Sequence, residues 1–247
     1  MSTAQAKPEQ PKSSGKEQPK SPTTGEPIST IGRRARAALW MFIVMDASGT
    51  IAIIIAYSYL WALNVNGGWA PPGASLTATE TNQSIPSSPP QASFATEWPF
   101  WAIFGLVVLS TLAMWFGYRE LKRGNHAGMI VGTGASFTIA VGALVAQWIQ
   151  ISTFPFAAGD GAYASAVLLL CASNIFNLLI LIFLQLGMLI RTNKGLVTQA
   201  VSYQPQIVSY WMIWLCIAFL LGAICTSFMV ESPNLDPAIF GTFQQQS

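Results

Sequence analysis

Apolar residues occur along the chain in five long runs, which are separated by polar or turn-forming segments. About 20 helical residues are enough to cross the hydrocarbon core of a bilayer, and each run reaches that length. The runs predict transmembrane helices over residues 36–63, 98–118, 127–151, 163–190 and 207–229. The sequence therefore predicts an all-α membrane protein whose membrane domain, residues 31–232, is a five-helix bundle.

Three segments outside the runs have a different character. Residues 1–30 are rich in Pro, Ser, Lys and Gln and contain no aromatic residue, so they cannot bury enough apolar surface to offset the entropy of ordering. We predict a disordered cytoplasmic tail there, because the first apolar run begins too late and is too long for a signal peptide. Residues 65–97 form a long outer loop with Gly and Pro pairs, and residues 233–247 form an outer C-terminal tail.

The composition agrees with a membrane protein and excludes a soluble domain. Of the 247 residues, 52% are hydrophobic and only 9% are charged, whereas soluble domains carry about 25% charged residues. No basic patch with interleaved aromatic residues points to nucleic acid, so we expect no nucleic-acid partner. The three cysteines lie in apolar runs without a neighbouring His, which predicts small core residues and not a disulfide framework or a metal site.

Charge placement predicts the orientation of the bundle. With five spans and an inner N-terminus, all twelve Lys and Arg residues fall on the same side of the membrane. The positive-inside rule therefore predicts an N-in, C-out topology. We expect an integral protein of the bacterial cytoplasmic membrane, or of the mitochondrial inner membrane, with the N-terminus on the cytoplasmic or matrix side. Aromatic belts sit at membrane interfaces, and four tryptophans are expected at the outer one: Trp61, Trp69, Trp98 and Trp101.

One acid, Asp46, lies well inside the first apolar run. A carboxylate at that depth costs several kcal/mol unless it is protonated, partnered or hydrated, so it marks a functional site by default. On a helix of 3.6 residues per turn, Asp46 shares a face with Thr50, Ile53 and Tyr57. The alternative is that Asp46 is a neutral acid that only forms hydrogen bonds inside the bundle.

Neutral polar residues and small residues also occur inside the spans. The polar residues are Gln147 and Gln150 in the third span and Asn174, Asn177 and Gln185 in the fourth. We favour interhelical hydrogen bonds for them, worth about 0.6 kcal/mol each on average, over an ion or proton path. Two stripes of small residues in the third span allow close helix approach on two sides: Gly128, Gly132, Ser136 and Ala140, and Gly134, Thr138, Gly142 and Ala146.

The sequence contains no recognisable catalytic, metal-binding or cofactor-binding motif. The one His, His126, lies in a short connection, so haem or copper ligation by this chain is not expected. No nucleophile–base pair, phosphate-binding loop or Cys/His metal spacing occurs. A transporter would need repeated halves or broken helices. By elimination, we predict a non-catalytic subunit of a larger membrane complex, without catalytic, cofactor or metal residues of its own.

The first helix resembles a known family. The run Leu39-Trp-Met-Phe-Ile-Val-Met-Asp46, followed by Ile55-Ala-Tyr57, is similar to the opening helix of subunit III of haem–copper respiratory oxidases. The five-span, N-in topology resembles the short bacterial form of that subunit, found in cytochrome c and quinol oxidases. The resemblance covers about residues 33–230.

The resemblance implies an accessory, non-redox subunit of a terminal oxidase in aerobic respiratory electron transport. Such a subunit packs on catalytic subunit I, beside a copper- or quinol-site subunit II, while haem and copper lie in those partners. It holds membrane phospholipid in a cleft between helices and supports proton uptake and turnover stability. The family's intramembrane carboxylate, which lines that cleft, corresponds to Asp46.

Other positions depart from the family pattern. Gln147 and Gln150 stand where the family usually has acids, and Asn174 and Asn177 stand where it usually has two His residues. The family's aromatic-Trp-His-Phe run is replaced by Tyr210-Trp-Met-Ile213. The chain is therefore either a divergent subunit III or a relative that has left the oxidase. The alternative class is a membrane scaffold or small-solute transporter subunit unrelated to respiration.

Overall fold

The computed structural model describes residues 25–64, 69, 94–230 and 232, and this part of the chain is all-α. The five long helices are α1 (Ile28–Leu63), α2 (Trp98–Lys122), α3 (His126–Ser152), α4 (Ala162–Asn193) and α5 (Tyr203–Phe228), and a 3-10 turn, η2 (Gln199–Val201), precedes α5. Each of the five is long and apolar enough to cross a membrane. The predicted bundle of five transmembrane helices is confirmed, and the chain is an integral membrane protein.

Most helices extend past the predicted spans. Helix α1 begins at Ile28, inside the segment predicted as a tail, and α4 continues to Asn193. Hydropathy marks only the part of a helix that lies in hydrocarbon, whereas the backbone hydrogen bonds continue wherever the chain stays helical. Pro27, whose ring fixes φ and removes the N–H donor, stands directly before the first turn of α1. The predicted long loop 65–97 and both tails lie almost wholly outside the described residues.

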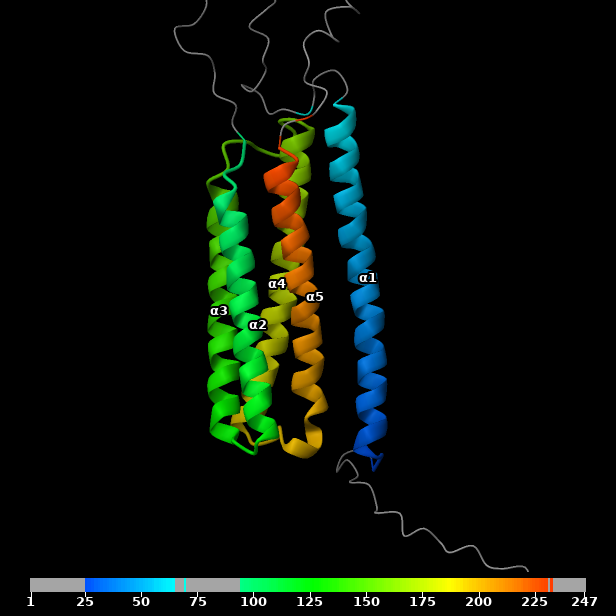
Figure 1. Ribbon diagram of the computed structural model, residues 1–247, viewed down its shortest axis with the longest axis vertical. Coiled ribbons are helices and arrows are strands. Elements are labelled where there is room, and N and C mark those ends of the chain that lie inside the picture. The colour runs from blue at the N-terminus through cyan, green and yellow to red at the C-terminus, as the bar shows by residue number, and fades with distance from the viewer. Residues whose placement is uncertain (1–24, 65–68, 70–93, 231, 233–247) are drawn as a thin grey trace, which may run out of the picture.

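The helices form a bundle of α2–α5 with α1 along one side (Figure 1). Helices α2 and α3 make the most extensive contact, while α1 contacts α4 and α5 and has little contact with the other two. Only 11% of the most apolar stretch of α1 is buried, compared with 50% for α5. In a membrane, the exposed side of α1 must therefore face lipid or another protein.

Every described Lys and Arg lies at one end of this bundle, where α1, α3 and α5 begin (the lower end in Figure 1). We call this end the basic end; its members are Arg33, Arg34, Arg36, Arg119, Lys122, Arg123, Arg191 and Lys194. The described acids at the opposite end are Glu97 and Asp160. This one-sided placement is the pattern on which the expected N-in orientation depends.

One small-residue stripe brings α2 and α3 together. Within it, Gly132 is buried, and a Cβ atom built on Gly132 would lie 2.5 Å from the Cα of Gly117 in α2. The second stripe does not make a close contact of this kind: a Cβ on Gly142 would meet nothing within 4 Å, and Thr138 is exposed. Helix α3 lies at the edge of the bundle, so only part of its surface can face a neighbouring helix (Figure 1).

Candidate functional site

The strongest candidate site is Asp46, in the middle of α1 where that helix meets α4 and α5. The indole Nε1 of Trp214 in α5 donates a hydrogen bond of 2.6 Å to Asp46 Oδ2. The amide Nδ2 of Asn177 in α4 donates to the same oxygen at 3.5 Å. Asp46 is half-buried. The acid is thus partnered from two helices, which offsets part of the cost of placing it in an apolar region.

Aromatic side chains surround this contact on the side toward the basic end. The Phe42 and Trp211 rings lie 4.8 Å apart, and the Trp40 and Tyr210 rings lie 6.3 Å apart, measured between centroids. Each pair joins α1 to α5. On this side of Asp46, aromatic contacts to α5 and the buried residues Leu39 and Ile43 attach α1 to the bundle.

Two buried polar atoms next to this contact have no hydrogen-bond partner within the described residues. They are the Asn177 amide oxygen and the Trp211 indole Nε1. Leaving such a group unpaired costs about 1–3 kcal/mol, and water or a polar ligand group can remove that cost. The site thus offers a carboxylate and an amide oxygen as acceptors. Within the described residues no group of three or more His, Cys, Asp or Glu residues could hold a metal ion.

Thr50 and Tyr57, which were predicted to lie on the same face of the first helix as Asp46, have different surroundings in the structure. Thr50 is half-buried one turn further along α1, and Tyr57 is fully buried. At 1.5 Å rise per residue, Tyr57 lies about 16 Å from Asp46 along the helix. Its hydroxyl donates to the Met229 carbonyl at 3.1 Å. Tyr57 therefore belongs to a second cluster at the end of the bundle opposite the basic end.

Trp69 is the centre of this second cluster. Its ring packs edge-on against Tyr57 and Tyr163, at 5.2 and 5.5 Å between centroids. Its indole Nε1 donates to the Val230 carbonyl at 2.8 Å, and its backbone N–H donates to Asn64 Oδ1 at 3.0 Å. Trp69 lies at the end of the bundle where the outer interface was expected, but its ring is fully buried and packs against protein. Its burial depends on partners distant in sequence, so no local signal predicted it.

The five neutral polar residues inside the spans are all buried, but they do not form one site. Asn177 binds Asp46, and Gln147 Nε2 donates to Gln150 Oε1 at 2.8 Å within α3. Asn174 is buried one turn of α4 from Asn177. Gln185 in α4 forms hydrogen bonds to α2, α3 and α5, which makes it the best-connected of the five.

Gln185 Nε2 donates to Ser136 Oγ in α3 at 2.7 Å and to Ser110 Oγ in α2 at 3.3 Å. We expect Gln185→Leu to lower the free energy of unfolding by about 0.6 kcal/mol, the average for a hydrogen bond between transmembrane helices. The loss should be small because the hydroxyls of Ser110 and Ser136 also pair with each other, at 3.1 Å. Reversible unfolding of the purified chain in detergent checks this value, and a loss of several kcal/mol would contradict it.

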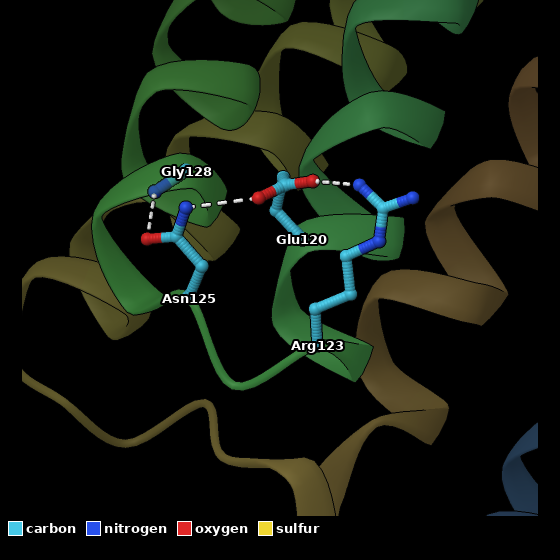
Figure 2. A network of polar contacts seen from close by, with 4 residues as sticks. All are labelled: Glu120, Arg123, Asn125 and Gly128. Carbon is cyan, nitrogen blue, oxygen red and sulfur yellow. Dashed lines mark hydrogen bonds and ion pairs between the residues drawn. The ribbon is translucent and has the colours of Figure 1, made fainter.

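A polar network closes the turn between α2 and α3 at the basic end (Figure 2). Glu120 Oε1 accepts from Arg123 Nη1 at 2.7 Å, and Glu120 Oε2 accepts from Asn125 Nδ2 at 2.8 Å. Asn125 Oδ1 in turn accepts from the backbone N–H of Gly128 at 3.1 Å, which caps the start of α3. Both carboxylate oxygens of Glu120 are therefore engaged inside this turn.

Comparison of the whole sequence with protein-family models and with curated proteins found no match. The fold and the site define an integral membrane protein with five long helices and one partnered acid inside a span. Any closer assignment depends on the resemblance of the first helix and on the geometry around Asp46.

Proposed function

We propose that this chain is an accessory, non-redox component of a haem–copper terminal oxidase, similar to subunit III. The observation that carries the proposal is the placement of Asp46, the acid of the motif that resembles the family. Asp46 lies where α1 packs against α4 and α5, and its carboxylate accepts hydrogen bonds from Trp214 and Asn177. Asn177 stands where the family usually has a His, and its amide still supplies a donor to the acid. The change from His to Asn is therefore compatible with the same arrangement.

The exposure of α1 supports a role inside a larger complex. Six large hydrophobic side chains on this helix are more than half exposed: Trp40, Met41, Val44, Met45, Ile55 and Tyr59. In the proposed complex the chain packs on catalytic subunit I, next to subunit II with its copper or quinol site, and membrane phospholipid occupies the region beside Asp46. Haem and copper belong to the partner subunits, and this chain supports proton uptake and stability during turnover.

The proposed location is the bacterial cytoplasmic membrane or the mitochondrial inner membrane. The basic end supports an orientation in which α1 begins on the cytoplasmic or matrix side, since Lys and Arg are retained on that side.

Purification of the tagged full-length chain from its native membrane in a mild detergent tests the function. We expect stoichiometric recovery of a larger His-rich membrane subunit, with haem absorption in the visible spectrum of the complex. The same chain produced alone should be colourless, because its one His, His126, is the first residue of α3 and lies outside the apolar part of that helix. Recovery only with non-respiratory partners would contradict the proposal and favour a scaffold or transporter subunit, and stoichiometric haem on the chain alone would also contradict it.

A further inference from the structure

A stripe of aromatic and basic residues runs along the outside of α2 at the basic end. The guanidinium carbon of Arg119 lies 4.7 Å from the centroid of the Trp115 ring. One turn away, Lys122 Nζ lies 4.6 Å from the centroid of the Tyr118 ring. Trp115, Arg119 and Lys122 are exposed, and Tyr118 is half-buried. We call these four residues the α2 stripe. Each cation in it is held against the face of an aromatic ring.

Arg119 and Lys122 of the α2 stripe form no ion pair with an acid in the described part of the chain. The nearest acid in sequence, Glu120, has both oxygens engaged by Arg123 and Asn125 in the turn (Figure 2). In the described part of the chain, Arg34 forms an ion pair with Glu26, and Arg123 forms one with Glu120. Arg119 and Lys122 are three residues apart on one helix, where like charges repel. An anion from outside the chain would remove that repulsion.

The surroundings of the α2 stripe indicate what kind of anion fits. The exposed apolar residues Leu112 and Phe116 lie on the same helix, on the side of the stripe toward the middle of the membrane. Trp and Tyr rings favour the level of lipid head groups. A guanidinium stacked on a ring still presents its N–H edges, which match the oxygens of a phosphate. The ligand should therefore combine a phosphate with a hydrocarbon chain.

We propose that the α2 stripe binds the phosphate of an anionic phospholipid from the membrane leaflet at the basic end. Arg119 and Lys122 contact the phosphate, while Trp115 and Phe116 contact the glycerol and the start of an acyl chain. This site lies on α2, away from Asp46 in α1, and the proposal holds whether or not the chain belongs to an oxidase. A basic residue near a membrane surface contributes about fivefold to binding of anionic lipid.

Native mass spectrometry of the purified full-length chain tests the site. Phosphatidylglycerol and phosphatidylcholine with identical acyl chains are titrated separately, and the dissociation constant of the first bound lipid is measured. We expect tighter binding of phosphatidylglycerol, by at least about fivefold. The double variant Arg119→Gln/Lys122→Gln should lose this preference and bind both lipids alike. Trp115→Leu, which keeps both charges and removes one ring, should give an intermediate loss.

The matched control is Arg33→Gln/Arg34→Gln, which removes two exposed charges at the same end from α1, a helix with little contact to α2. This variant should keep the preference for phosphatidylglycerol. Soluble glycerol phosphate should not displace the lipid, because it lacks the acyl chain. Equal losses in the two double variants, the absence of a preference in the unaltered chain, or displacement by glycerol phosphate would each overturn the proposal. A preference for phosphatidylglycerol that no variant changes would mean that the lipid binds elsewhere, and it would also overturn the proposal.

Discussion

Replacing Asp46 with leucine should lower the free energy of unfolding by about 1–3 kcal/mol, because it leaves the Trp214 indole N–H and the Asn177 amide without their acceptor. Asp46→Asn should cost less than about 1 kcal/mol, since the amide is nearly isosteric and its oxygen can still accept from Trp214. Denaturant unfolding of the purified chains in detergent measures both values. Thr50→Val is the control on the same face of α1, and it should be close to neutral.

The same variants separate a structural from a functional role of Asp46. If the carboxyl group serves lipid binding or proton delivery, both Asp46→Asn and Asp46→Leu complexes should lose activity faster during turnover than the unaltered complex, at equal assembly. We expect this result. Bound lipid should also fall in both variants, which extraction and mass spectrometry of the purified complexes can measure. Identical decay curves at equal assembly would rule out a functional role and leave only hydrogen bonding.

Replacing Gly132 with alanine should also destabilise the chain strongly. The new Cβ would lie 2.5 Å from Gly117 Cα, 2.6 Å from Gly117 N and 2.9 Å from the Ala113 carbonyl oxygen. All three are backbone atoms, so no side-chain rotation can relieve the contact and α2 must move away from α3. Overpacking of this kind costs about 1–3 kcal/mol and occasionally more.

Gly142→Ala is the matched control for this prediction. It makes the same chemical change in the same helix, but the new Cβ meets nothing within 4 Å. Thermal unfolding followed by circular dichroism should show a clearly lower midpoint for Gly132→Ala and an unchanged or slightly higher one for Gly142→Ala. Equal midpoints for both variants would mean that the α2–α3 contact is looser than the structure describes.

Part of the candidate site could be recognised without the fold. An acid in an apolar run stands out in any membrane protein, because its presence there is costly. The polar character of Asn177 and Gln185 was equally visible. Their partners were not, because Trp214 is separated from Asp46 by 168 positions and Ser110 from Gln185 by 75. Which polar groups meet depends on how the helices are arranged, and hydropathy carries no information on that arrangement.

The periodicity of α3 illustrates the same limit. Both small-residue stripes are equally regular in the sequence, yet only the one with Gly132 brings two backbones into close contact. A four-residue repeat of small residues indicates that another helix can approach closely on that side. The close contact forms only where the fold places a neighbouring helix there. The position of α3 at the edge of the bundle, next to α2 and α4, decided which stripe was used.

The number of transmembrane helices and their approximate spans follow from the amino-acid sequence, because a helix in a membrane satisfies its own backbone hydrogen bonds and needs only a local apolar run. The one-sided distribution of Lys and Arg is likewise visible in the sequence. The attachment of α1 through Asp46, the burial of Trp69 and the pairing of Arg119 and Lys122 with aromatic rings were decided by the three-dimensional structure. The first two join residues distant in the chain, and for the third the sequence spacing allows the contact without requiring it.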